Sequence, residues 1–299
     1  MNLKLEKYIG LPSHMSGGFD HVDVYESNGY LFLAHTANGT VEVIDGDRGI
    51  HSRTLPGCPG ASGVVCAQKE GLVFAAARGG GKVLVIDTKT QTVLREISAG
   101  FKPNGIAWDT SHGLLLATDV EDLQARLLSR ETGAVTGSVK LPGRPRWCKY
   151  SQRTDSFWIN IQKPAELLRV EPQTAKIREA FSVSVDGPHG LDIDEKEGRA
   201  FIACDGKAIV VLGLQSGIEL DAAQISGEPD VVWFNRNQHR LYCAIGRPGI
   251  VDVIDTSTMK LEQEVETEEG AHTLTFDETR RKLYVFLPRS CRVAVYRES

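Results

Sequence analysis

The sequence predicts an all-β protein, a seven-bladed β-propeller with four-stranded antiparallel blades, because one pattern recurs seven times along its 299 residues. The string Val-Ile-Asp begins at Val43, Val85 and Val253, at separations of 42 and of four times 42 residues. A bulky residue inside a short apolar run recurs in steps of 42, 42, 42, 43, 41 and 42 residues. This period matches one propeller blade. The recurring residues are Phe32, Phe74, Leu116, Trp158, Phe201, Tyr242 and Tyr284.

Each copy of the repeat predicts four strands, which we call A to D from the axis outwards. Strand A is an entry such as 190–193, strand B a short apolar run such as 201–203, and strand C ends in the Val-Ile-Asp string. Strand D alternates polar and apolar residues, as in 260–265, which suits an exposed outer edge. Asn38-Gly39 marks a hairpin between strands B and C, since both residues tolerate positive φ. No segment predicts a helix.

The seventh copy of the repeat is shorter than the others and ends with strand C at 292–296. Residues 4–9 resemble the D strand at 260–265, so we expect the N-terminal strand to complete this blade. That pairing closes the ring and leaves no open sheet edge between the first and last blades. The sequence therefore predicts a single propeller domain over residues 1–299, although the length alone would allow two domains.

Composition excludes some classes of partner. The formal net charge is −5 and no lysine-rich run is present, which argues against nucleic acid as a ligand. The N-terminus does not resemble a signal peptide, and no apolar run reaches the ~18 residues of a membrane helix. Six cysteines without a C-x-x-C pair predict reduced thiols, and we expect a cytoplasmic protein that does not bind membranes.

The strings Val-Ile-Asp-Thr at 85–88 and 253–256, together with Pro-x-Gly entries such as 103–105, resemble the YVTN-repeat propellers. That family includes surface-layer and YncE-like proteins. The resemblance covers essentially the whole chain and implies the propeller fold. It does not imply one activity, because the family is functionally mixed.

A functional site is expected where the loops between strands D and A, and between B and C, gather on one face of the ring. A polar residue opens strand A in each blade, and three consecutive blades offer His189, Asp230 and His272. With His21, these residues are the predicted ligands of a divalent metal, because imidazole and carboxylate groups would converge on the axis. A solvated polar ring without a function would give the same pattern. The seven opening residues are Asp20, Ser62, Asn104, Arg146, His189, Asp230 and His272.

We assign catalytic roles to His189, His272 and Arg146: an imidazole would act as general base and the guanidinium would hold a negative charge. Trp147 would either stack on the ligand or plug the channel. The expected substrate contacts come from the strand A entries and from the neighbouring B–C loops. These contacts are His35, Arg78, Asn104, Asp119 and Trp147.

Two enzyme families show partial similarity at the strand A entries. Pro103-Asn104-Gly105 and Pro229-Asp230-Val231 resemble metal-ligand segments of the regucalcin and gluconolactonase propellers. Pro188-His189-Gly190 resembles the histidine entries of virginiamycin B lyase, a propeller that uses magnesium and a histidine base. Neither set of residues is complete in this chain, so neither substrate is transferred.

These observations lead to two hypotheses of different kinds. The first is a metal-assisted hydrolase or lyase that acts on a small anionic molecule at the channel mouth, the metal polarising a carbonyl or activating water. The alternative is a non-catalytic scaffold that binds a protein or peptide partner. The short loops with few aromatic residues offer little for a protein interface, which favours the enzyme.

Overall fold

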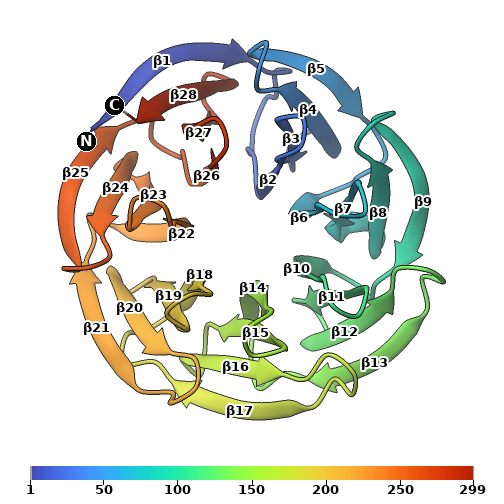
Figure 1. Ribbon diagram of the computed structural model, residues 1–299. Coiled ribbons are helices and arrows are strands. Elements are labelled where there is room, and N and C mark those ends of the chain that lie inside the picture. Colours follow the sequence, from blue (N-terminus) through green and yellow to red (C-terminus); the bar gives the residue numbers. More distant parts are fainter. Residues whose placement is uncertain (1, 299) are drawn as a thin grey trace.

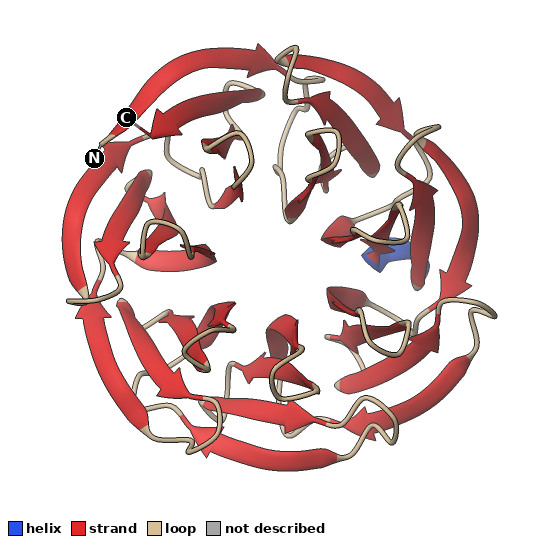
Figure 2. Ribbon diagram, in the orientation of Figure 1, coloured by secondary structure: helices blue, strands red, loops and turns tan. Residues whose placement is uncertain are grey.

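The computed structural model describes residues 2–298 and forms a closed ring of seven four-stranded antiparallel sheets around a central axis (Figure 1). Strands make up almost all of the regular structure (Figure 2). The single helical element within 2–298 is η1 (Arg78–Gly80), a 3-10 turn inside a hairpin. The predicted seven-bladed propeller is therefore confirmed.

In every blade the strands follow one another from the axis to the rim, and only the seventh blade borrows its outermost strand. The first four blades are β2 (Val22–Tyr25), β3 (Tyr30–His35), β4 (Thr40–Asp45) and β5 (Ile50–Leu55); β6 (Ala61–Ala67), β7 (Leu72–Ala77), β8 (Lys82–Asp87) and β9 (Thr92–Ser98); β10 (Pro103–Asp109), β11 (Leu114–Asp119), β12 (Gln124–Ser129) and β13 (Val135–Lys140); β14 (Pro145–Ser151), β15 (Ser156–Ile161), β16 (Glu166–Val170) and β17 (Ile177–Ser182). The other three are β18 (Pro188–Asp194), β19 (Arg199–Cys204), β20 (Ala208–Gly213) and β21 (Glu219–Gln224); β22 (Glu228–Asn235), β23 (Arg240–Arg247), β24 (Ile250–Asp255) and β25 (Lys260–Glu266); β26 (Thr273–Asp277), β27 (Lys282–Leu287), β28 (Arg292–Glu298) and β1 (Leu3–Gly10).

The ring is closed by β1, which pairs antiparallel with β28 so that the two ends of the chain lie side by side (Figure 1). The register sets Leu3 opposite Glu298 and Ile9 opposite Val293. Leu3 and Ile9 are both buried. The N-terminal strand thus removes an open sheet edge and adds to the core, as the sequence predicts.

The core lies between neighbouring blades and is built around strand B, the second strand of each sheet. The seven bulky residues that mark the repeat, Phe32 to Tyr284, are all fully buried there. Truncating a buried aromatic residue to alanine costs about 3–5 kcal/mol and truncating a buried leucine about 2–5 kcal/mol, so each repeat marker is a major contributor to stability. The innermost strands are therefore held on a rigid ring.

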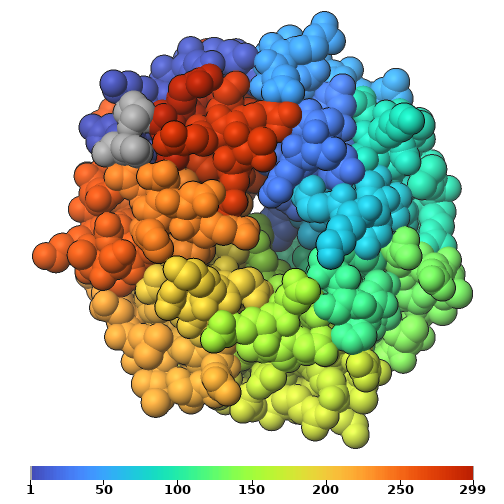
Figure 3. Space-filling view, in the orientation of Figure 1, coloured from blue at the N-terminus to red at the C-terminus, as the bar shows by residue number. Residues whose placement is uncertain are grey.

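The side chains at and just before the innermost strands form three tiers along the axis, which is hollowed on the face shown in the space-filling view (Figure 3). We call them the mouth tier, the plug tier and the opposite tier. The mouth tier is Asp20, Ser62, Asn104, Arg146, His189, Asp230 and His272. The plug tier is His21, Gly63, Gly105, Trp147, Gly190, Val231 and Thr273, and the opposite tier is Asp23, Val65, Ala107, Lys149, Asp192, Trp233 and Thr275.

All six cysteines are free thiols, and every one except Cys291 is buried. Burial raises the pKa of Cys58 to about 12, which keeps this thiol protonated and unreactive. Within the described part of the chain, no helix has the length and apolar character needed to cross a membrane.

Candidate functional site at the channel mouth

The mouth tier opens into a cavity of about 430 Å³ between the fourth and seventh blades. Its polar lining comes from the starts of the innermost strands or the residue just before them, from the loop after β19 and from the end of β23. Equivalent positions in successive blades are related by the rotation of the ring, so these side chains meet near the axis. The polar lining residues are Arg146, His189, Asp205, Glu228, Asp230, Arg247 and His272.

His189 is held between two carboxylates. Its Nδ1 lies 2.8 Å from Asp205 Oδ1, and its Nε2 lies 3.2 Å from Asp230 Oδ1. Burial disfavours the imidazolium, but the charge of Asp230 and the hydrogen bonds to both carboxylates outweigh it. The pKa of His189 is therefore raised above its ordinary value. A doubly protonated His189 can donate to both carboxylates at once, and the nearby charge of Arg146, 2.8 Å from the same Nδ1, opposes that state only in part.

Asp230 is the hub of the cluster. Besides His189, its Oδ2 lies 3.8 Å from His272 Nε2, and its Oδ1 accepts a 3.4 Å hydrogen bond from Trp147 Nε1. Burial alone would raise the pKa of this carboxyl group. The charge and hydrogen bond of His189, followed by His272 and His21, instead hold the pKa of Asp230 well below its usual range. Asp230 is therefore ionised, and its carboxylate oxygens face the N–H groups of the neighbouring rings.

Arg146 is the group in the cavity whose hydrogen-bonding capacity is unmet. One guanidinium nitrogen lies 2.8 Å from His189 Nδ1, a nitrogen already engaged with Asp205. The Nε atom of Arg146 is buried without a hydrogen-bond partner, and no ion pair of Arg146 occurs within residues 2–298. Burial lowers its pKa, although Asp230 and Asp205 oppose the shift. Arg146 is thus a half-buried cation with a buried, unpaired Nε–H and no carboxylate within ion-pair distance among the described residues.

His272 is the most exposed imidazole of the cluster, with 36% of its side chain accessible. Its Nε2 donates a 3.0 Å hydrogen bond to the carbonyl oxygen of Phe19. This bond fixes the neutral tautomer in which Nδ1 carries the lone pair. Nδ1 has no hydrogen-bond partner among the described residues, so it can accept a proton.

His21 and Trp147 lie one tier deeper than the cavity and close it. Their rings stack with centroids 3.9 Å apart, and His21 Nε2 contacts Asp20 Oδ1 at 3.3 Å. Burial lowers the pKa of His21, which keeps this ring neutral. Of the two roles considered for Trp147, the geometry favours the plug, while its indole N–H still positions Asp230.

Two predicted substrate contacts serve the fold instead. His35 was expected at the mouth, but as the last residue of β3 it is fully buried and hydrogen-bonds to Glu42 and His14. Asp119 is also fully buried, and its carboxylate accepts backbone N–H groups from residues 101, 102, 121 and 122. Both predictions were wrong for the same reason: the side chain is turned into the blade, where it satisfies buried polar groups.

Two other predicted contacts stay at the mouth without lining this cavity. Arg78 forms an ion pair with Asp20 at 3.2 Å. Asn104 belongs to the mouth tier, and its buried Oδ1 has no hydrogen-bond partner. Asn104 therefore remains a candidate for ligand contact, whereas Arg78 already has its counter-ion.

Asp205 also lines this cavity, although it was not among the site residues predicted from the sequence. It lies in the loop after β19, in the same blade as His189, and Gln162 Nε2 donates to its second oxygen at 2.8 Å. Hydrogen bonds from His189 and Gln162 overcome burial and lower the pKa of Asp205. Its place in the B–C loop next to His189 was the available signal.

The predicted metal ligands do not form a compact donor set. Across residues 2–298, three His, Cys, Asp or Glu ligand atoms within 4.8 Å of one another occur only at Asp109, His112 and Asp155. In the mouth tier, both nitrogens of His189 already face carboxylates, and an imidazolium has no lone pair for a metal. The residues of the mouth therefore do not fit a divalent cation in this arrangement.

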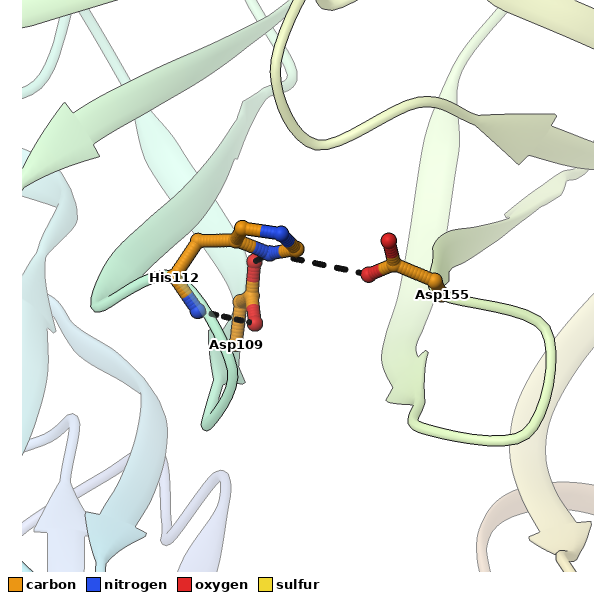
Figure 4. A group of neighbouring side chains, drawn as sticks. All are labelled: Asp109, His112 and Asp155. Carbon is orange, nitrogen blue, oxygen red and sulfur yellow. Dashed lines mark hydrogen bonds and ion pairs between the residues drawn. The ribbon is translucent and has the colours of Figure 1, made fainter.

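The compact group formed by Asp109, His112 and Asp155 joins two turns of neighbouring blades (Figure 4). Asp109 Oδ2 accepts a 2.8 Å hydrogen bond from His112 Nδ1, and its Oδ1 accepts the backbone N–H groups of Ser111 and His112. Gln173 Nε2 donates to the remaining nitrogen of His112 at 3.1 Å. Both imidazole nitrogens are thus engaged, and the group acts as a turn cap.

Comparison with protein-family models finds no match for this chain, and comparison with curated proteins finds none. The assignment of a function therefore depends on the geometry of the site.

Proposed function

We propose that the channel mouth binds a small anionic molecule, a carboxylate or a phosphate, and acts on it as a hydrolase or lyase. The observation that carries this proposal is the half-buried Arg146, which lines the cavity without an ion pair and with a buried, unpaired Nε–H. Asp205 and Asp230 are both bonded to His189 and neither forms an ion pair with Arg146, so the guanidinium keeps a donor free for a ligand anion. A planar guanidinium also suits the two oxygens of a carboxylate or phosphate.

In this proposal three residues have separate roles in binding and proton transfer. Arg146 anchors the anion, and His189, kept protonated by Asp205 and Asp230, supplies a fixed positive charge beside it. His272 accepts a proton at Nδ1, because Phe19 holds its other nitrogen as the donor. The metal expected from the sequence stays a prediction, and none of these three roles requires it.

A ligand titration tests the proposal. Inorganic phosphate and succinate are the probes, and binding is measured by calorimetry and by the rise in melting temperature. An anion at 100 times its dissociation constant stabilises the folded state by about 2.7 kcal/mol. Arg146→Met should abolish this stabilisation, and His272→Ala should preserve it within a few-fold in affinity.

The same titration separates the enzyme from the scaffold alternative. A protein-binding scaffold predicts no stabilisation by either anion. Equal stabilisation of the wild type and of Arg146→Met would remove Arg146 from the site and overturn the proposal. Once a substrate is known, the loss of His272 should lower kcat by about 10²–10⁴-fold with little change in binding.

A further inference from the structure

A second cluster of histidines lies outside the channel, between the first and seventh blades. It joins His14 in the segment before β2, His35 at the end of β3 and Cys291 in the turn between β27 and β28. His14 Nδ1 lies 2.8 Å from His35 Nε2 and 3.7 Å from Cys291 Sγ. Nothing in the proposed function uses these residues.

Glu42 contacts this cluster through His35, on the side away from His14. Glu42 is fully buried, and its Oε1 accepts a 3.1 Å hydrogen bond from His35 Nδ1. Its Oε2 accepts from His51 Nε2 at 2.8 Å, and the hydroxyl groups of Thr40 and Thr54 complete its partners. Because Nδ1 of His35 is the donor to Glu42, Nε2 of His35 carries a lone pair that is aimed at His14.

This pattern of a carboxylate, a histidine and a second donor is the one that orients imidazole ligands on a metal ion. Bonds to zinc are about 2.0–2.1 Å from nitrogen and about 2.3 Å from sulfur. At tetrahedral angles these lengths place two nitrogens about 3.3 Å apart, and a nitrogen and a sulfur about 3.6 Å apart. The observed nitrogen–sulfur separation of 3.7 Å is close to the expected value, whereas the 2.8 Å between the nitrogens is a hydrogen bond that must lengthen by about 0.5 Å when a metal replaces its proton.

We propose that His14 Nδ1, His35 Nε2 and Cys291 Sγ bind a divalent transition-metal ion of the zinc type, with Glu42 as the group that orients His35. Cys291 is the one cysteine that is not buried, and the ion is reached from a cavity of about 340 Å³ that His14 lines. Arg247 and Arg289 on the cavity wall are each paired with Glu269, which limits their repulsion of a cation.

Binding requires one local rearrangement. Cys291 Sγ now contacts His14 on both ring nitrogens, at 3.7 Å and 4.0 Å, and does not belong to a three-donor group within 4.8 Å. On binding, the sulfur gives up its 3.7 Å contact with the carbonyl oxygen of Pro288 and moves toward His35. The thiol loses its proton on binding, so affinity increases with pH.

Cobalt(II) is the probe for this site, because a thiolate bound to cobalt gives a charge-transfer band in the near ultraviolet. The full-length protein, first treated with a chelator, is titrated with Co²⁺. We expect saturation at one ion per chain with this band, and displacement of the cobalt by one equivalent of Zn²⁺. Cys291→Ser should remove the band, and Glu42→Gln should weaken binding by about 10- to 100-fold.

His14→Ala and His112→Ala form a matched pair, since both change one partly exposed histidine. His14→Ala should abolish one-to-one binding and His112→Ala should leave it unchanged. Circular dichroism of both variants checks that each remains folded. The proposal is overturned if the wild type shows no thiolate band, if the band survives in Cys291→Ser, or if His112→Ala is the variant that loses the ion.

Discussion

The two ends of the channel carry the same kinds of charge but use them differently. At the opposite tier, Lys149 Nζ lies 3.1 Å from Asp192 Oδ1, with Asp23 nearby. At the mouth tier, His189 lies between Asp205 and Asp230. Each end thus holds a cation flanked by two carboxylates.

The difference lies in the other partners of those carboxylates. Asp23 accepts the backbone N–H of Cys66 in the next blade at 2.7 Å, and Asp192 accepts that of Phe234 at 2.8 Å. These two side chains therefore clamp neighbouring blades together. At the mouth tier the carboxylates face side chains, and one further cation, Arg146, remains without an ion-pair partner. A candidate binding site is distinguished from a structural contact by a charged group without an ion-pair partner, as at the mouth, and not by the number of charges.

The largest effect of a substitution along this axis is expected at the opposite tier. Lys149→Met should lower the free energy of unfolding by about 2 kcal/mol, because it leaves Asp192 and Asp23 without their cation. This loss is smaller than that for a fully buried pair, since about a third of the Lys149 side chain, 34%, is exposed. Urea denaturation measures it. A stability equal to that of the wild type would show that Lys149 is not part of the clamp.

A smaller effect is expected when the hub of the mouth is neutralised. Asp230→Asn should lower the pKa of His189, because burial then acts against a weaker opposing charge. The pKa of His189 is higher in the folded state than in the unfolded chain, where it is near 6.5. The charged imidazole therefore stabilises the folded state fully at a pH below 6.5. This stabilisation is lost as the pH rises through the pKa of the folded state. The variant should show a weaker dependence of stability on pH in that window.

Nuclear magnetic resonance of the imidazole nitrogens measures this pKa directly. Asp205→Asn is the matched variant, and it should lower the pKa of His189 by less, since Asp230 contributes both its charge and a hydrogen bond. A pKa of His189 that stays constant in Asp230→Asn would contradict the described charge balance.

Much of this structure could be predicted from the sequence because the period of about 42 residues fixes which positions are equivalent. Rotation of the ring then converts equal spacing into convergence on the axis, which is why Arg146, His189, Asp230 and His272 were found. The same logic fails in the hairpin loops. There, one residue of strand alternation decides whether a side chain faces the mouth, as Asp205 does, or the interior of a blade, as His35 does.

The cluster around Glu42 could not be predicted, because its members come from segments with no common period. His14 lies in the long segment between β1 and β2, and Cys291 lies near the other end of the chain. They meet only because β1 closes the ring. A contact that forms only on ring closure cannot be predicted from the spacing of the repeat.

The central claim is that Arg146 is a half-buried cation whose partner is a ligand, and the smallest expected change tests it most directly. Burial lowers the pKa of Arg146, which means that the folded state penalises its charge. In the absence of anions, Arg146→Met should therefore unfold in urea with a free energy within about 0.5 kcal/mol of the wild type, or higher. A loss of about 2 kcal/mol, as expected for Lys149→Met, would show that Arg146 is a structural ion-pair partner and would contradict the assignment of the mouth as a binding site.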